Sequence, residues 1–268
     1  MSPGTEPTSA ASVLSIIVPV FNEAATLASV LAIVSEALPA VGKEIIVVDD
    51  GSTDGTREWL RTHFPDGARS GHSIKVDAGN NLAVIDDGPA AKTIIRPIYH
   101  EKNSGKGAAV RTGFAAASGD VIVIQDADLE YDPTDWAAMY DLIARRKVAD
   151  VVYGSRFYGR PHRSLYFHHY VANRFISLTF NLLYNQTLTD IECCYKMFTH
   201  AVKERLTLTC DDFGCEIQMS AQIARAGDLR IYEVGISYYG RTYEEGKKIG
   251  WRDGIKALWY LIRFRLSA

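Results

Sequence analysis

Short apolar runs alternate with longer amphipathic stretches through the first half of the chain. The apolar runs at residues 15–20, 44–50, 93–100, 121–126 and 150–155 are typical of strands buried on both faces of a sheet. The stretches at 24–38, 55–64, 107–117 and 133–147 are typical of helices, and Asp132 before Pro133 supplies a capping carboxylate to the last of them. This alternation predicts an α/β fold, with a mostly parallel sheet covered by helices on both faces.

Residues 65–92 interrupt the alternation, because two short apolar stretches at 73–76 and 82–85 flank the turn-forming run 77–81. This pattern predicts a hairpin inserted before the third strand. In the second half we predict helices at 167–184 and from Gly214, a strand at 231–238 and a final helix at 251–264. Residues 1–13 are small and polar, and they predict a disordered leader. We therefore expect one domain at 14–240, followed by a basic loop and an amphipathic helix at 241–268.

The composition limits the classes of function. A chain of 268 residues with 47% hydrophobic residues can bury one large core, and its net charge of −3 argues against nucleic-acid binding. The four cysteines form no C-x₂-C pair, which favours reduced thiols over a zinc site. No apolar run approaches the ~20 residues that a membrane span needs. We expect a cytoplasmic protein, with peripheral contact at the inner face of a membrane left open.

Two carboxylates, Asp126 and Asp128, follow the fourth apolar run. In an extended backbone, residues two apart point the same way, so we expect both carboxylates on one side of the strand's end. Ligands of open α/β sheets bind beyond the carboxyl ends of the strands, and hard oxygen ligands suit Mg²⁺ or Mn²⁺. The pair predicts a metal site, with a solvated pair of loop aspartates as the alternative.

Polar turns also follow the first three predicted strands. Two of them read Phe21-Asn22-Glu23 and Asp49-Asp50-Gly51-Ser52-Thr53-Asp54. These are ordinary turn formers, but they fall at the same sheet edge as the aspartate pair, so their convergence predicts a nucleotide pocket with Phe21 as an apolar wall. The third turn, Asn103-Ser104-Gly105-Lys106-Gly107, opens a helix whose first amides could meet phosphate; simple turn and helix packing is the alternative.

Together these motifs resemble those of the family-2 glycosyltransferases, in particular the polyprenyl-phosphate sugar synthases of the dolichol-phosphate mannose synthase type. The matching segments are Ile17-Val18-Pro19-Val20-Phe21-Asn22-Glu23, Val48-Asp49-Asp50-Gly51-Ser52-Thr53-Asp54-Gly55-Thr56, Asn103-Ser104-Gly105-Lys106-Gly107, Asp126-Ala127-Asp128-Leu129-Glu130 and Gly154-Ser155-Arg156-Phe157. The resemblance runs from about residue 14 to about residue 260, without the hairpin insertion. It implies a Rossmann-like GT-A fold and an inverting transfer from a nucleotide diphosphate sugar, either a GDP- or a UDP-hexose.

The resemblance also implies roles for individual residues. Those implied to contact the nucleotide sugar are Pro19, Phe21, Glu23, Val48, Asp50, Lys106, Asp126, Ala127, Asp128 and Arg156. Those implied to hold Mg²⁺ or Mn²⁺ are Asp126, Asp128 and Glu130, and many relatives carry glutamine at the position of Glu130. Arg241 and Lys247 match a late basic pair associated with phosphate.

The basic pair has a physical role of its own. A departing nucleoside diphosphate gains negative charge as its bond to the sugar breaks, and a metal ion, Arg241 and Lys247 can stabilise that charge. A solvated loop is the alternative, because Glu244 and Glu245 lie between the two cations.

The acceptor is harder to derive. A phosphate monoester has a second pKa of ~6 and is an anion at neutral pH, so polyprenyl phosphate needs no protein base, whereas a hydroxyl acceptor needs one. Asp211, Asp212 and Glu216 are candidate bases, with capping of the helix from Gly214 as their alternative role. The basic, aromatic segment 156–184 and the helix 251–264 favour a lipid acceptor, although the helix could also close the core. We expect hexose transfer to polyprenyl phosphate, with transfer to a hydroxyl of a glycan or small molecule as the alternative.

Overall fold

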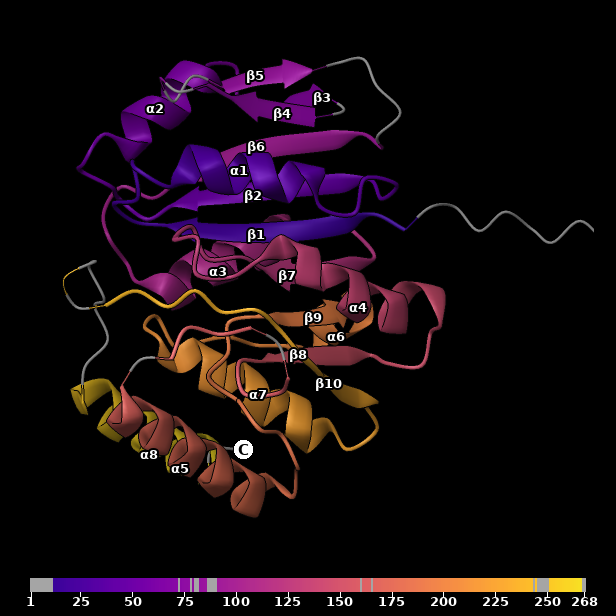
Figure 1. The fold of residues 1–268 in the computed structure, drawn as a ribbon, viewed down its shortest axis with the longest axis vertical. Helices are drawn as coiled ribbons and strands as arrows, with labels where there is room; N and C mark the ends of the chain where they lie inside the picture. Colours follow the sequence, from indigo (N-terminus) through magenta and orange to yellow (C-terminus); the bar gives the residue numbers. More distant parts are fainter. Residues whose placement is uncertain are drawn as a thin grey trace, which may run out of the picture.

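The computed structural model describes residues 12–71, 73–77, 79, 82–85, 91–159, 161–164, 166–242, 244 and 251–266. Most of the described strands form one sheet, in the order β10-β8-β9-β7-β1-β2-β6-β3 (Figure 1). Their bounds are β1 (Leu14–Val20), β2 (Lys43–Asp49), β3 (Arg69–Gly71), β6 (Thr93–Tyr99), β7 (Val121–Ile124), β8 (Val151–Ser155), β9 (Lys196–Thr199) and β10 (Ile231–Gly235). Neighbouring strands are parallel except where β3 or β9 takes part, which confirms the mostly parallel sheet.

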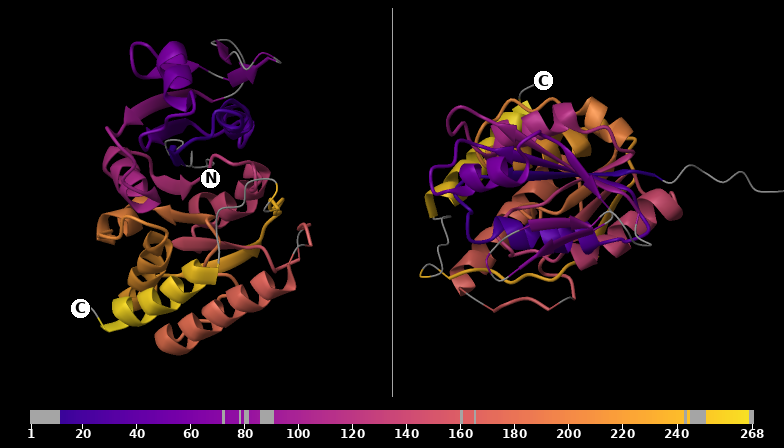
Figure 2. Two further views of the ribbon diagram at one scale, coloured as in Figure 1. Left: turned by 90° about the vertical axis from the view of Figure 1, so that its left-hand side faces the viewer. Right: turned by 90° about the horizontal axis from the view of Figure 1, so that it is seen from above.

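Helices cover both faces of this sheet, as predicted. Figure 2 shows α1 and α4 on one face and α3, α6 and α7 on the other. The helices are α1 (Leu27–Glu36), α2 (Thr56–His63), α3 (Lys106–Ala116), α4 (Trp136–Tyr140), α5 (Phe167–Tyr184), α6 (His200–Arg205), α7 (Gly214–Ala226) and α8 (Trp251–Leu266). A 3₁₀ turn, Pro133–Asp135, precedes α4 and a π-helical turn, Asp141–Arg145, follows it, so the predicted helix at 133–147 is one segment of mixed winding. Asp132 caps it by accepting from the Thr134 amide at 2.9 Å.

The last helix and α5 lie side by side beyond the β10 edge of the sheet (Figures 1 and 2). The Tyr184 hydroxyl donates to the Leu261 carbonyl at 3.1 Å, and Arg265 Nε donates to the Leu183 carbonyl at 2.9 Å. Because the carboxyl ends of both helices meet in these contacts, α5 and α8 run in the same direction. None of the helices in the described ranges is long and apolar enough to cross a membrane.

The central strand β1 is where the order of the sheet reverses. It pairs with β2 on one side and with β7 on the other, and Ile16, Ile17 and Val18 have no exposed surface. Parallel strands on both sides bring the turns after β1, β2 and β7 to one edge. Such a switch point leaves a crevice outside the carboxyl ends of the strands, where ligands of open α/β sheets bind.

The structure adds to the sequence-based prediction or departs from it in several elements. The hairpin is present as β4 (Ser73–Val76) and β5 (Leu82–Ile85), but it forms a separate sheet, and the Ile74 amide donates to Ser35 Oγ of α1 at 3.2 Å. The short strands β3 (Arg-Ser-Gly) and β9 (Lys-Met-Phe-Thr) were not predicted, because neither is a continuous apolar run. The strand predicted at 121–126 ends at Ile124, so the aspartate pair lies in a turn.

Candidate active site

The turns after β1, β2 and β7 are joined by hydrogen bonds at the carboxyl edge of the sheet. Asn22, in a left-handed conformation at φ 57°, accepts from the Thr53 amide at 2.8 Å, and its own amide donates to Ser52 Oγ at 2.9 Å. Thr26 Oγ1 donates to the Ala127 carbonyl at 2.6 Å. The predicted convergence of these turns is therefore present in the structure.

The aspartate pair does not follow the alternation that we inferred from the sequence. Since β7 ends at Ile124 and Leu129 adopts φ 60°, the two carboxylates lie on a turn and pair with different cations. Lys106 Nζ lies 2.8 Å from Asp126 Oδ1, and Arg241 Nη2 lies 2.8 Å from Asp128 Oδ2. The argument from strand geometry was wrong, although both aspartates do lie at the predicted edge.

Arg241 is the centre of a group of carboxylates. Besides Asp128, its Nε donates to Glu130 Oε1 at 3.1 Å and its Nη1 lies 4.0 Å from Glu23 Oε2. The other oxygen of Glu130 accepts from the Tyr238 hydroxyl at 2.9 Å. Burial, together with the nearby charges of Asp126 and Glu130, raises the pKa of Asp128 to about 7, although Arg241 opposes that rise.

The chemistry of this group fits a divalent cation. Within the described ranges no three His, Cys, Asp or Glu side chains form a group that could hold a metal ion as they stand. Lys106 and Arg241 occupy carboxylate oxygens of Asp126 and Asp128. Yet Asp126, Asp128 and Glu130 offer only hard oxygens, which suit Mg²⁺ or Mn²⁺. Burial is the main cause of the raised pKa of Asp128, and the nearby carboxylates of Asp126 and Glu130 add to it. A divalent ion would favour the ionised form of these carboxylates.

The residues of the β1 and β2 ends that are predicted to contact the nucleotide sugar occupy two kinds of position. Pro19 and Val48 are buried within β1 and β2, whereas Phe21 and Glu23 are partly exposed in the turn beyond β1. Asp50 is buried, and its carboxylate accepts from the amides of Ser104 at 3.0 Å and Gly105 at 2.7 Å. Asp50 therefore holds the turn that precedes Lys106.

The glycines of that turn serve close packing. Gly105 adopts φ 99°, and a side chain on Gly107 would lie 2.1 Å from the Cys210 carbonyl. The Gly107 amide donates to the Asp211 carbonyl at 2.8 Å. These amides already have protein partners, which favours the packing alternative over direct phosphate binding.

A buried chain of charges continues from Lys106 away from the edge. Lys106 Nζ approaches Glu216 Oε1 of α7 to 3.2 Å, and Lys196 Nζ lies 2.8 Å from Glu216 Oε2. Burial acts to raise the pKa of Glu216, but Lys196 and Lys106 outweigh burial and lower it. A carboxylate held ionised between two lysines is part of the support beneath Asp126.

A second candidate base, Asp212, is a helix cap. Its carboxylate accepts from the Gly214 amide at the start of α7 and from the Tyr260 hydroxyl of α8, both at 2.9 Å. This geometry matches the capping alternative, and it ties the last helix to the site.

Arg156 lies close to the carboxylate group without joining it. Its guanidinium forms a fork with Asp190, with both N–O distances 2.7 Å, and stands 5.3 Å from the centre of the Tyr238 ring. The pairing of Arg156 with Asp190 was not predicted, although Thr189-Asp190 ahead of Cys194-Tyr195-Lys196 resembles an acceptor-side segment of the family. Tyr238 was not predicted as a site residue, and the tyrosine-rich run beside Arg241 was the available signal. Lys247, the second member of the predicted basic pair, lies outside the described residues.

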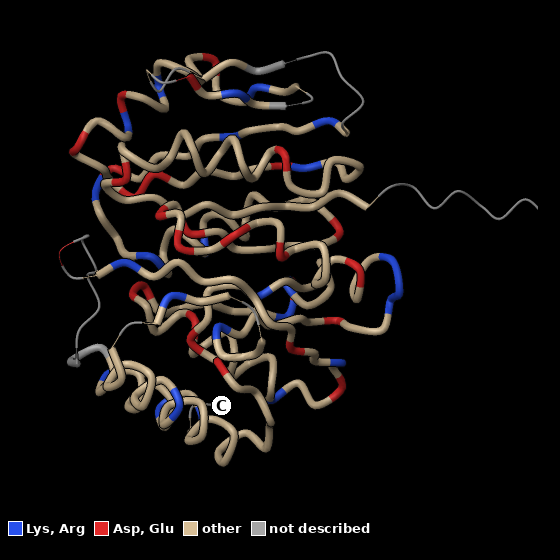
Figure 3. The backbone as a smooth tube through the Cα atoms, in the orientation of Figure 1, with Lys and Arg blue, Asp and Glu red and all other residues tan. Residues whose placement is uncertain are grey.

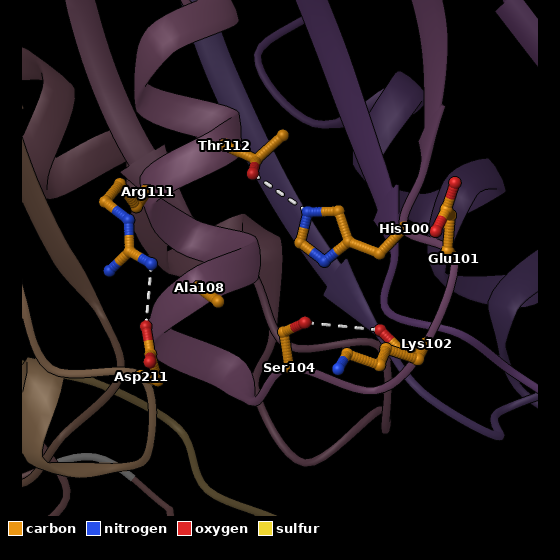
Figure 4. Close-up of a pocket in the computed structure, with 8 residues that line it drawn as sticks. All are labelled: His100, Glu101, Lys102, Ser104, Ala108, Arg111, Thr112 and Asp211. Carbon is orange, nitrogen blue, oxygen red and sulfur yellow. Dashed lines mark hydrogen bonds and ion pairs between the residues drawn. The ribbon is translucent and has the colours of Figure 1, made fainter.

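A separate surface cavity of about 450 Å³ lies beside α3 (Figure 4). Its lining residues are His100, Glu101, Lys102, Ser104, Ala108, Arg111, Thr112 and Asp211. His100 Nε2 lies 2.9 Å from Thr112 Oγ1, and His100 Nδ1 lies 2.7 Å from Asp50 Oδ1. The carboxylates around Arg241 do not line it.

Comparisons with known proteins bear on the family and the fold of the chain. Residues 15–206 match the model of glycosyl transferase family 2. Glycosyltransferase AglJ of Haloferax volcanii is 30% identical over 84% of this chain, and this chain spans 63% of its length. Undecaprenyl-phosphate mannosyltransferase of Micrococcus luteus is 26% identical over 94% of this chain and 98% of its own. The structure of glucosyl-3-phosphoglycerate synthase from Mycobacterium tuberculosis, with Mn²⁺, UDP and phosphoglyceric acid, superposes with a TM-score of 0.66 and 18% identity, covering 96% of this chain and 80% of that one.

Proposed function

The chain belongs to glycosyl transferase family 2, and on that premise we propose that it transfers a hexose from a nucleotide diphosphate sugar to polyprenyl phosphate, with inversion at the anomeric carbon. The observation that carries the proposal is the group of Asp126, Asp128 and Glu130 at the carboxyl edge of β7. Lys106 pairs with Asp126, and Arg241 pairs with the other two carboxylates. A carboxylate group with a nearby guanidinium has the chemistry to bind a metal–diphosphate complex.

Each part of this site has a defined task in the reaction. Asp126, Asp128 and Glu130 would hold Mg²⁺ or Mn²⁺, which supplies Lewis-acid stabilisation of the departing diphosphate. Arg241 would offer the same diphosphate a bidentate fork, and Lys247 a mobile charge. Lys106 pairs with Asp126 and orients it from below, since Lys106 is itself held by Glu216.

The state of the candidate bases favours a phosphate acceptor. Glu216 is ion-paired with two lysines, Asp212 caps α7 and Asp211 pairs with Arg111 at 2.7 Å, so each candidate base already has a partner in the protein. A phosphate monoester is already an anionic nucleophile at neutral pH, with a second pKa of ~6. A relative along nearly the whole chain is named as an undecaprenyl-phosphate mannosyltransferase, which supports the same acceptor class.

The test is a transfer assay with a panel of donors. Purified protein would be incubated with Mg²⁺ or Mn²⁺, polyprenyl phosphate and labelled UDP- or GDP-hexoses, and label extracted into organic solvent would be counted. We expect extractable label from one donor, dependent on both metal and lipid. Label that stays in water as free sugar, or on an added glycan, would reject the lipid acceptor and favour the hydroxyl alternative.

Helices α5 and α8, which lie side by side, supply a surface that suits a lipid acceptor. On α5, Leu178 is 55% and Leu182 is 78% exposed, and on α8, Trp259 and Ile262 are each 53% exposed. No acidic residue occurs in α5 (Figure 3). Arg263 and Arg265 lie in the last turn of α8. Apolar side chains with flanking cations favour peripheral contact with an anionic bilayer.

We expect the protein to sediment with vesicles that contain anionic lipid, and less with neutral vesicles. The double variant Leu182→Glu, Trp259→Glu should weaken this partitioning at least about tenfold, since two apolar anchors become charges that the anionic surface repels. Ile33→Glu on α1, an equally apolar residue that is 39% exposed, is the matched control. Equal losses in the two variants would mean that α5 and α8 are not the contact surface.

A further inference from the structure

The geometry points to Arg241 as an internal counter-cation of the metal site, which a divalent ion and a nucleoside diphosphate displace together. Free protein would then bind the ion weakly, and the nucleotide would strengthen ion binding by giving Arg241 a new partner. This inference rests on the proposed metal site and adds to it an order of binding.

The first observation is that Arg241 engages the oxygens a metal ion would need. Asp128 Oδ2 is 2.8 Å from its Nη2, and Glu130 Oε1 accepts from both its Nε at 3.1 Å and its backbone amide at 3.0 Å. The Asp128 and Glu130 side chains are only 18% and 13% exposed. An ion that enters must therefore take these oxygens from the guanidinium.

The second observation is that the backbone holds Arg241 over the group. The Tyr239 amide donates to the Glu130 carbonyl at 2.9 Å, and Tyr238 forms a bridge with Tyr131. These contacts connect the segment after β10 to the turn after β7. The fold thus fixes the backbone just before Arg241 beside the carboxylates, whereas the guanidinium is held only by its own contacts with them.

The two cations of the site differ in their freedom to move. The Lys106 side chain is 14% exposed and is held by Asp126, Glu216 and the Cys194 thiol. The Arg241 side chain is 26% exposed, and its carboxylate partners Asp128 and Glu130 belong to the proposed metal site. Arg241 is therefore the cation that can leave when an ion arrives.

Displacement by an ion alone is unfavourable. It would bring a divalent cation next to a guanidinium that has lost its carboxylate partners, and an uncompensated charge at a partly buried site is costly. A diphosphate removes that cost, because guanidinium binds phosphate oxygens in a bidentate fork. Ion and nucleotide binding are then coupled, and by linkage each must strengthen the other by the same factor.

Mn²⁺ titration followed by the EPR signal of free Mn²⁺ tests this at pH 8, without and with UDP or GDP. In the native protein we expect the better nucleotide to strengthen Mn²⁺ binding by about tenfold or more. Arg241→Gln should bind Mn²⁺ about tenfold more tightly than the native protein without nucleotide, and should lose most of the strengthening by nucleotide. Arg241→Lys, which keeps a cation, should stay close to the native protein without nucleotide.

The matched control is Arg230→Gln, because Arg230 forms a similar fork with Asp150 at 2.7 Å on a different part of the surface. It should change neither affinity. If Arg241→Gln binds Mn²⁺ no more tightly than the native protein while Asp128→Asn abolishes binding, the metal site stands and the counter-cation role is wrong. If Asp128→Asn binds Mn²⁺ as the native protein does, both the metal site and this inference are wrong.

Discussion

Replacing Asp128 by asparagine is expected to lower the rate of sugar transfer about 1,000-fold, while the protein stays folded. Removing one group that stabilises transition-state charge typically costs 10²–10³ in kcat, and here the same change also removes the partner of Arg241. Asparagine has nearly the same shape and can still accept at Glu130 N, where Asp128 accepts at 3.3 Å. The measurement is kcat/KM for the labelled donor at saturating metal, with thermal unfolding recorded for both proteins.

Asp132→Asn is the control for this substitution. Asp132 lies on the same connection, and its role is to cap the 3₁₀ turn through the Thr134 amide at 2.9 Å. Asparagine caps about as well as aspartate, so transfer by Asp132→Asn should stay within a few-fold of the native rate. Transfer by Asp128→Asn within tenfold of the native rate would show that its carboxylate does not serve the diphosphate.

The edge on which the site is built could be predicted from the sequence alone. The apolar runs before Asn22, Asp49 and Asp126 are long enough to indicate buried parallel strands, and parallel strands bring their carboxyl ends together. Turn residues after such strands fall at one edge whatever the details of the turn. For this reason the positions of the carboxylates were right even though the strand geometry assumed for Asp126 and Asp128 was not.

The partners of those carboxylates could not be predicted in the same way. Arg241 lies 113 residues from Asp128 in the sequence, and Lys106 is joined to Glu216 of α7. Periodicity reports which face of an element is buried, but not which distant side chain meets it. The contact with the nucleotide sugar that the resemblance implies for Asp50 stays a prediction. The structure shows the Asp50 carboxylate accepting from the Ser104 and Gly105 amides, a role in holding this turn that the sequence pattern does not report.

Replacing Glu216 by glutamine is expected to lower the free energy of unfolding by about 3–5 kcal/mol, because it leaves the buried Lys196 without a counter-charge. Lys106 also loses one of its two carboxylate partners, although Asp126 stays. Lys196 has no exposed side-chain surface, and its other contacts are the Cys193 carbonyl at 2.6 Å and the Tyr153 ring at 5.5 Å. The measurement is the midpoint and slope of urea unfolding. Glu204→Gln is the control, since Glu204 is 61% exposed and its pair with Lys203 lies on the surface. It should unfold like the native protein.

The same variant also discriminates between the two acceptors. A catalytic base can be changed from glutamate to glutamine with little effect on stability, but transfer to a hydroxyl would then be lost. A structural carboxylate behaves in the opposite way: the protein loses stability, and the part that remains folded still transfers sugar to a phosphate, which needs no base. Adding Lys196→Gln to Glu216→Gln should recover part of the lost stability, because one unpaired buried charge is removed as well. A stable Glu216→Gln protein that has lost transfer would instead identify Glu216 as the base and a hydroxyl as the acceptor.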